Sequence, residues 1–508
     1  MSNKKSLWVG LSLLTSWLAF GAEFAPYFTA GAVLQRDRPI EIWGTGRNGE
    51  QVVVELMGHS ASTAVAEGAW RVSLPAMAAA SATTLKLRGD NEKILEDIAL
   101  GEVWFGCGQS NMEWRLNQCA PYSDNLLAQA DQPSIRQLKI PLRPYKGDPQ
   151  PSFAWKKFDR SSGPVFGALA YYFAAALQRE IGVTVGIVNC SFGGSTIEAW
   201  MTREELLSAG MEAALAEDAK NLSIWKDFPT YDKAWKAYQE DKKAWDLLKK
   251  KDPADPTPAP SEPYGYRSKR RPTTLRDAML KPVLPYGARG AVWYQGENNA
   301  GQPADYAKML PVFMEGLRRS KHESNWPILI AQLSSPSANW PDEQEGYAPL
   351  REIQRAVAVA DSHSGFIVAL DYGEKGQVHP RNKQPVGERL ARLALGKVYK
   401  KSLGAVQSPY VLSAKWIEGN IEVSFAGLVG ALEIRKDIAA VIRLRTSEGK
   451  GVAPKSVHLS SDQRRLIITP EDGLRPDEVR YAYQNFCELG LYSEGDLPVS
   501  PWILSVKE

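Results

Sequence analysis

The sequence is poor in the residues that build metal centres. Its 508 residues include only four cysteines and five histidines, with no CxxC pair and no HExxH motif. Zinc sites need such spacings, so we predict no metal site. The 61 basic residues barely exceed the 58 acidic ones, and the formal charge is +3. That charge is too small to hold nucleic acid by electrostatics alone.

Long apolar runs are equally scarce, and the one candidate stands at the start of the chain. Lys4 and Lys5 precede an apolar stretch over residues 7–20, and Gly21 and Ala22 follow it. This pattern is typical of a secretory signal peptide, which we predict over residues 1–22. About 14 apolar residues are too few to span a bilayer comfortably, although an uncleaved anchor is the alternative. We therefore predict a secreted or periplasmic protein without a membrane span after signal removal. In that compartment one or two disulfides are permitted.

The remaining composition is that of a folded, multidomain chain. Hydrophobic residues make up 44% and charged residues 23%, which argues against disorder. The 41 glycines and 33 prolines exclude a long coiled coil. The 16 tryptophans and 19 tyrosines fit either a large core or platforms for stacking sugars.

Short strand patterns fill both ends of the chain. Residues 40–43 and 52–56 are strand-like, and residues 70–74 alternate apolar and polar side chains. These patterns predict an N-terminal β-sandwich over residues 23–97. The same texture returns at 421–425, 457–459 and 466–469. We therefore predict a C-terminal β domain over residues 401–508.

Between these ends, buried-type strands alternate with helical patterns. Strands are predicted at 103–107, 183–189, 290–294, 328–333 and 366–370, with helices at 168–181 and 385–399. This alternation predicts an α/β fold with a doubly wound sheet over residues 98–400. Ligands of such sheets bind at the carboxyl ends of the strands.

An insertion at about 220–270 interrupts this domain. Tyr231, Trp235, Tyr238 and Trp245 recur at helical spacing among lysines, and a proline-rich stretch follows them. We predict an amphipathic helix followed by a stiff exposed loop. The aromatic stripe is either a packing face or a sugar platform.

Two segments that follow predicted strands carry groups for acyl transfer. Ser110 lies between a strand and a helix, where its hydroxyl is presented outward, or where it simply caps the helix. Gly193 and Gly194 form a pair whose backbone N–H groups can approach a ligand closely, although a simple tight turn also explains them.

Two further segments add polar groups at strand ends. Gln295, Glu297 and Asn298 follow the strand at 290–294, and such side chains are costly to bury unless they are paired or face a site. Gln295 or Asn298 is placed to donate to an oxyanion. Of the five histidines, only His379 follows the last strand of the predicted sheet, where a general base is needed.

Together the four segments resemble the sialate O-acetylesterase family of SGNH hydrolases. The motifs are GQSNM at 108–112, FGGS at 192–195, WYQGEN at 293–298 and VHP at 378–380. The resemblance implies hydrolysis of acetyl esters on sugars by an SGNH-type α/β/α domain, with no metal or organic cofactor. It assigns Ser110 as nucleophile and His379 as base, with an oxyanion hole from the Ser110 N–H, Gly193 or Gly194, and Gln295.

The sequence departs from the family where an acidic partner of His379 is expected, because Gly376 and Gln377 stand there. Glu297 or Asp371 could orient the histidine, as could a backbone carbonyl in a Ser–His dyad or the Gln377 amide. We favour the dyad or the backbone partner. Activity is then expected to rise with pH through an ionisation of His379 near about 6.5.

We therefore interpret the chain as an exported serine esterase that removes O-acetyl groups from sialic acids through an acyl-enzyme. The alternative substrate is an acetylated plant glycan such as xylan or xyloglucan. A rival from another class is a sugar-binding protein that has lost catalysis, which the presence of Ser110, His379 and Gln295 together argues against.

Overall fold

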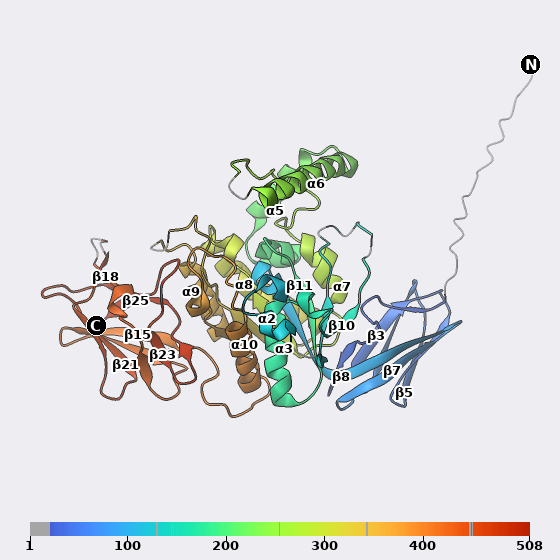
Figure 1. Cartoon of the computed structure of the whole chain (residues 1–508), viewed down its shortest axis with the longest axis horizontal. Helices are drawn as coiled ribbons and strands as arrows, with labels where there is room; N and C mark the ends of the chain where they lie inside the picture. Colours follow the sequence, from blue (N-terminus) through green and yellow to red (C-terminus); the bar gives the residue numbers. More distant parts are fainter. Residues whose placement is uncertain are drawn as a thin grey trace, which may run out of the picture.

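The computed structural model describes residues 21–128, 131–143, 145, 147–149, 151–252, 255–341, 344–446, 449 and 451–508. All but two residues of the predicted signal peptide lie outside this part of the chain. Three regions stand side by side in Figure 1: an N-terminal β region in blue, a central α/β region, and a C-terminal β region in orange and red. Helices α5 (Glu212–Ser223) and α6 (Phe228–Lys251) project from the central region, and α6 lies within the insertion.

The N-terminal region consists of strands that pair antiparallel, except β2, which runs parallel to β8. Along β6 every second residue is buried, as the alternating sequence predicts, because successive side chains of a strand point to opposite faces. The strands before β8 are β1 (Glu23–Phe24), β2 (Val33–Gln35), β3 (Ile40–Thr45), β4 (Gln51–Leu56), β5 (His59–Ala64), β6 (Ala69–Leu74) and β7 (Ala80–Arg88).

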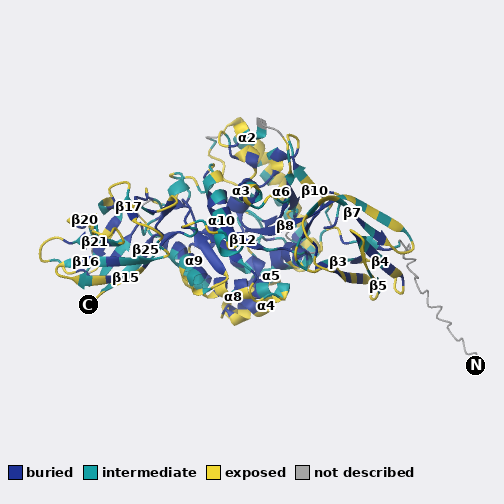
Figure 2. Cartoon of the chain, turned by 90° about the horizontal axis from the view of Figure 1, so that it is seen from below, coloured by how far each residue is buried: buried dark blue, intermediate teal, exposed yellow. Residues whose placement is uncertain are grey.

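One long strand, β8 (Glu92–Gly108), joins this region to the central sheet. Its first part pairs with β2 and β7, and its second part pairs with β11 (Val185–Ser191) and β12 (Gly290–Tyr294). Every residue from Ile98 to Gly108 is buried, and Figure 2 shows the inner strands in the buried colour. The central region therefore begins on a strand that the N-terminal region also holds.

The central sheet has the order β10-β9-β11-β8-β12-β13-β14. All neighbours in it run parallel except β10 (Trp155–Phe158), which is antiparallel to β9 (Gln132–Lys139). The remaining strands are β13 (Ile328–Ala331) and β14 (Ser364–Ile367). The chain order reverses around β8, whose two neighbours are β11 and β12, and this switch point is where open α/β sheets bind ligands.

Helices cover both faces of this sheet. On β14, a side chain at Gly365 would meet Leu393 of α10 (Gln384–Lys397), whereas the adjacent Ser364 bonds to Arg318 of α8 (Pro303–Lys321). Neighbouring residues of a strand face opposite sides, so α10 and α8 lie on different faces. Helix α3 (Ala168–Ile181) packs beside α10, and α9 (Ala348–Ala360) packs beside α8. The predicted α/β class is confirmed.

The sequence-based interpretation missed β9 and β10. The β9 sequence is largely polar, yet Arg136 and Gln137 are buried in it. Arg136 donates to the carbonyls of Gly31 and Asp97, and the Gln137 side-chain oxygen accepts from Gly167 N–H. Polar side chains satisfied in this way hide a buried strand from any search for apolar runs.

The C-terminal region is built on an eight-stranded sheet. Its strands are β15 (Tyr410–Ile417), β16 (Asn420–Ala426), β18 (Ile442–Arg445), β19 (Gly451–Val452), β20 (Ser456–Leu459), β21 (Arg465–Thr469), β22 (Glu478–Tyr481) and β25 (Trp502–Lys507). No helix in the described ranges has the length and apolarity needed to cross a bilayer. The thiols of Cys107, Cys119 and Cys190 are buried and form no disulfide.

A buried carboxylate marks the junction on β8. Both oxygens of Glu102 accept from Arg289, and further bonds come from Arg36, Gln35 and Tyr399, at 2.8–3.1 Å. Burial alone would raise the pKa of Glu102, but the hydrogen bonds and charge of Arg289, with Gln35 and Arg36, outweigh it and lower the pKa. The charged carboxylate thus ties the N-terminal region to the central sheet.

Replacing this carboxylate should destabilise the protein. We expect Glu102→Gln to lower the free energy of unfolding by about 3–5 kcal/mol, because two partly buried arginines lose their anion. Urea unfolding at neutral pH measures the loss. Glu92→Gln is the control, since Glu92 lies on the same strand as Glu102 but forms only an exposed pair, with Arg88 of β7. Its loss should cost less than about 1 kcal/mol. Equal losses in the two variants would contradict this assignment.

Candidate active site

The turn that carries Ser110 is shaped by close contact between β8 and β12. Gly108 has a φ of +137°, and a Cβ on it would lie 2.1 Å from the Tyr294 carbonyl oxygen, so only glycine fits. Gln109 N–H donates to that same oxygen at 3.0 Å. Ser110 then begins the short helix α1 (Ser110–Glu113), so its N–H has no acceptor within the helix.

All four predicted segments meet at one cavity of about 690 Å³ beside this turn. Its walls include Ser110, Gly193, Gly194, Glu297, Asn298 and His379. Ser110 follows β8 and Gly193 follows β11, while Glu297 and Asn298 follow β12. The structure therefore brings these predicted residues together at the carboxyl edge of the sheet.

Gly193 lies directly against Ser110. A Cβ on Gly193 would be 3.3 Å from the Ser110 Cβ, so the glycine backbone faces the hydroxyl-bearing residue without a side chain between them. Its N–H donates to the carboxylate of Glu113, on the helix that Ser110 begins. Sequence reasoning missed Glu113, because only the fold places its carboxylate on the glycine loop.

Asn111 connects three segments of the site. Its Nδ2 donates to Glu297 Oε1 at 2.6 Å and to the carbonyl of Val378 at 3.0 Å, while its Oδ1 accepts from Lys383 Nζ. All but Val378 are buried. Asn111 directly follows Ser110, the predicted nucleophile. Its bond to Val378 thereby holds the loop that carries His379 next to the Ser110 turn. The sequence analysis contained Asn111 only as a letter of the GQSNM motif and assigned no role to Lys383.

Glu297 is a buried carboxylate with one unused oxygen. Oε1 accepts from Asn111, whereas Oε2 has no hydrogen-bond partner among the described residues. Burial raises the pKa of Glu297, against the opposing effects of the Asn111 hydrogen bond and the Lys383 charge. A polar atom left unpaired beside a cavity is suited to meet a ligand or water there.

His379 lies against an aromatic wall. Its ring stacks on Trp114 with centroids 4.6 Å apart and planes tilted by 31°. Burial, and then the nearby Lys383 charge, lower the pKa of His379 to about 4. We therefore expect His379 to ionise below the value of about 6.5 predicted from the sequence, because the ring is desolvated and faces a cation. A carboxylate partner would raise the pKa instead.

The other predicted residues lie outside this cavity. Asp371 forms a bidentate pair with Arg389, both oxygens at 2.7 Å, and Gln377 is exposed. Gln295 is fully buried, and its Nε2 donates to the Ser195 carbonyl at 3.3 Å and to Asn299 Oδ1 at 2.7 Å. In this arrangement the Gln295 amide donates no hydrogen bond into the cavity.

The site is built from single donors and acceptors and shows no metal-ligand set. Within the described ranges, no group of three or more His, Cys, Asp or Glu side chains could hold a metal ion. The chemistry that this arrangement permits is attack by a serine hydroxyl, assisted by a neutral imidazole, beside backbone N–H donors.

Comparisons with known proteins are consistent with chemistry on acyl esters. Residues 101–224 and 271–395 match the family described as "Carbohydrate esterase, sialic acid-specific acetylesterase". Sialate O-acetylesterase of Rattus norvegicus is 26% identical over 460 residues, covering 79% of each chain. The human sialate O-acetylesterase is 25% identical, covering 73% of this chain and 70% of that one.

A solved structure is similar over nearly the whole chain. The carbohydrate acetylesterase from Xanthomonas citri superposes with a TM-score of 0.78 at 28% identity, covering 95% of this chain and 99% of that one. The similarity thus includes the flanking β regions as well as the sheet that carries the site.

The environment of His379 predicts an unusual titration. We expect its imidazole to stay neutral down to about pH 4, and Trp114→Ala to raise its pKa toward about 6.5, because the variant exposes the ring to water. NMR of ¹⁵N-labelled histidines measures both values, with His379→Asn assigning the signal. A wild-type midpoint near 6.5 would show that the ring is solvated.

Proposed function

The chain belongs to the sialate O-acetylesterase family of carbohydrate esterases, and we propose that it removes O-acetyl groups from sugars through an acyl-enzyme on Ser110. The observation that carries this proposal is one cavity, walled by Ser110, Gly193 and His379, at the switch point of the sheet. Because the same cavity is lined by Ser110, Gly193, Asn298 and His379, we also assign the chain to the SGNH type of hydrolase, which is named after these four residue types.

In the proposed reaction, Ser110 Oγ attacks the acetyl carbonyl while His379 accepts its proton. The tetrahedral intermediate collapses, and His379 returns the proton to the departing sugar hydroxyl. A water molecule then attacks the acyl-enzyme by the same route and releases acetate. His379 is neutral before each of the two attacks, since its pKa of about 4 keeps it unprotonated at ordinary pH.

The oxyanion is proposed to bind where backbone donors converge. The Ser110 N–H begins a helix, and the Gly193 N–H lies against Ser110. The Glu113 carboxylate accepts from Gly193, so the substrate must displace it before that donor is available. Asn298 lines the cavity and supplies a side-chain donor, whereas Gln295 orders the loop behind it. Each donor is worth about 3 kcal/mol of transition-state stabilisation.

A Ser–His dyad is the arrangement that the charges favour. Burial and Lys383 are the influences that shift the pKa of His379, and both lower it. Asp371 is taken by Arg389, and Glu297 is anchored to Asn111. We assign Glu297 as a positioning residue, because Asn111 joins it to the carbonyl of Val378, the residue before His379.

The leading substrate is an O-acetylated sialic acid, because the sialate O-acetylesterases match most of this chain. Acetylated plant glycans such as xylan or xyloglucan are the second candidate, since the Xanthomonas citri structure is described only as a carbohydrate acetylesterase. Acetate release from a panel of acetylated sialic acids and xylo-oligosaccharides distinguishes the two. Secretion or a periplasmic location remains a prediction from residues 1–22.

Removing the nucleophile tests the mechanism. We expect Ser110→Ala to lower kcat/KM for acetyl esters by about 10³-fold or more while the thermal unfolding midpoint stays at the wild-type value. A fluorophosphonate should label the wild-type protein, with the adduct mapped to Ser110 by mass spectrometry, and leave the variant unlabelled. Unchanged hydrolysis in the purified variant would remove Ser110 from the mechanism.

The role of Glu297 separates a dyad from a triad. We expect Glu297→Gln to keep kcat/KM within about tenfold of wild type, because the amide oxygen still accepts from Asn111, whereas loss of a triad acid costs about 10⁴-fold. Asp371→Asn is the control outside the cavity and should lower the unfolding midpoint by weakening the Arg389 pair. A loss of about 10³-fold or more in folded Glu297→Gln would establish a triad.

A further inference from the structure

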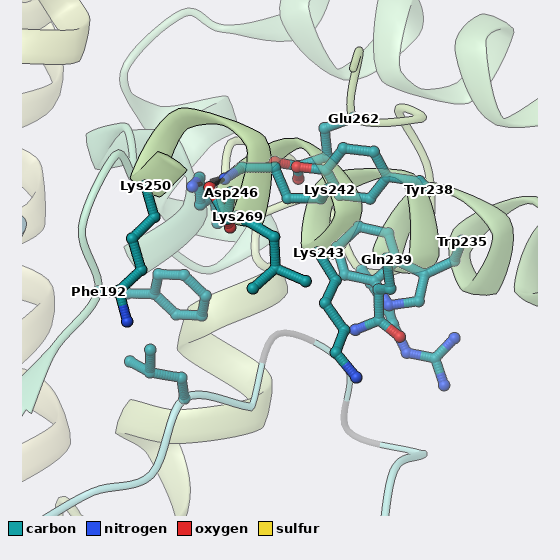
Figure 3. A pocket seen from close by; sticks show the side chains of 13 residues that line it. Phe192, Trp235, Tyr238, Gln239, Lys242, Lys243, Asp246, Lys250, Glu262 and Lys269 are labelled. Carbon is teal, nitrogen blue, oxygen red and sulfur yellow. Dashed lines mark hydrogen bonds and ion pairs between the residues drawn. The ribbon is translucent and has the colours of Figure 1, made fainter. Parts of the chain in front are cut away.

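A second cavity, of about 630 Å³, lies between α6 of the insertion and the loop after β11. Figure 3 shows Trp235 and Tyr238 of α6 on one side and Phe192 of the loop on the other. The rings of Trp235 and Tyr238 lie 5.5 Å apart at 49°, and both are only half-buried. They therefore present aromatic surface to whatever enters.

The aromatic stripe of the insertion thus divides into two functions. Tyr231 is fully buried and packs against Trp225 and Tyr266, so it belongs to the packing core of the insertion. Trp235 and Tyr238, further along the helix, line the cavity instead. Leu247 stands at the same wall and is 61% exposed, which is unusual for a leucine and leaves apolar surface available to a ligand.

The cavity also carries an excess of positive charge. Its basic wall residues outnumber its acidic ones, Asp246 and Glu262. Most of these basic side chains form ion pairs with acidic ones. Arg267 pairs with both Asp148 and Asp232. Lys242 pairs with Asp246, and Lys269 pairs with Glu262.

Two lysines remain uncompensated. Lys243 and Lys250 have no acidic partner among the described residues, although both line the cavity. Because the other cations are balanced, these two ammonium groups give the wall its net attraction for an anion. A ligand that combines an apolar ring face with a carboxylate matches both the aromatic and the charged part of the wall.

This cavity is adjacent to the candidate active site. Phe192 directly precedes Gly193, and Lys269 lines both cavities. A Cβ on Gly194 would lie 3.0 Å from Lys269 Cε, and Lys269 Nζ lies 5.8 Å from the Phe192 ring centroid. A glycan with its acetyl ester at Ser110 therefore meets the α6 wall as it extends past Lys269.

We propose that the α6 cavity is a subsite for a carboxylate-bearing sugar residue of the glycan whose acetyl ester reaches Ser110. Trp235 and Tyr238 stack on its ring, and either Lys243, beside Trp235, or Lys250, beside Phe192, binds its carboxylate. The inference rests on the proposed esterase function and narrows the substrate to acidic oligosaccharides. Sialic acid and uronic acid share this chemistry, so the test includes both.

Calorimetric binding to Ser110→Ala, which keeps substrates intact, tests the subsite. The probes are sialyllactose with lactose as its neutral match, and glucuronoxylo-oligosaccharide with xylo-oligosaccharide as its match. We expect at least one acidic probe to bind about tenfold more tightly than its neutral match. Adding Lys243→Ala with Lys250→Ala should abolish that preference, and adding Trp235→Ala should weaken both members of the pair.

The matched control is Lys233→Ala with Lys251→Ala, two exposed lysines of α6 outside the cavity wall, which should keep the preference. The subsite would be overturned if both double variants lost the preference for the acidic probe to the same extent, or if the acidic and neutral probes bound with equal affinity. It would also be overturned if single-stranded DNA bound as tightly as the acidic probe.

Wild-type hydrolysis of p-nitrophenyl acetate separates the two proposals. An active enzyme without a preference for acidic probes overturns the subsite alone. An inert enzyme that keeps the preference overturns the proposed esterase function and supports the subsite.

Discussion

The approach of the Gly108 backbone to the Tyr294 carbonyl is the constraint on which the site depends. Without a Cβ at Gly108, β8 and β12 end close enough for Gln109 N–H to bond the same oxygen, and this places Ser110 beside the loop that follows β12. Any larger residue would push the strand ends apart, because its Cβ would meet the carbonyl at 2.1 Å. The position of Ser110, the proposed nucleophile, is thus set by backbone packing between two buried strands.

Asn111 transmits this placement to the rest of the site. Its amide holds a buried carboxylate, Glu297, and a buried ammonium, Lys383, on opposite ends. Burial lowers the pKa of Lys383 to about 8, so in neutral solution it is still charged and repels a proton from His379. His379, the proposed base, is therefore unprotonated in neutral solution, but it is also a weak base. The oxyanion that develops in the proposed reaction must stabilise the imidazolium that forms.

The sequence predicted most clearly what depends on local pattern. The predicted segments 290–294 and 168–181 coincide with β12 and α3, because each is a continuous stretch of the expected type. The direction of the Gln295 amide depends on Asn299, whose own orientation is fixed by Ile197 N–H and the Glu198 carboxylate from another loop. Likewise, no local pattern shows that Arg389 occupies Asp371 or that Trp114 covers His379.

The insertion reaches the active cavity without altering the nucleophile turn. As the chain returns from the insertion, Arg270 Nε donates to the Gly194 carbonyl and Thr196 Oγ1 donates to the Arg270 carbonyl. These bonds attach the insertion to the loop beside Ser110, whereas Ser110 itself is positioned by β8 and β12. Changes along α6 can therefore alter which glycan is bound while the reacting groups keep their geometry. The proposed chemistry thus lies on the sheet, and the proposed selectivity lies on an element attached to its edge.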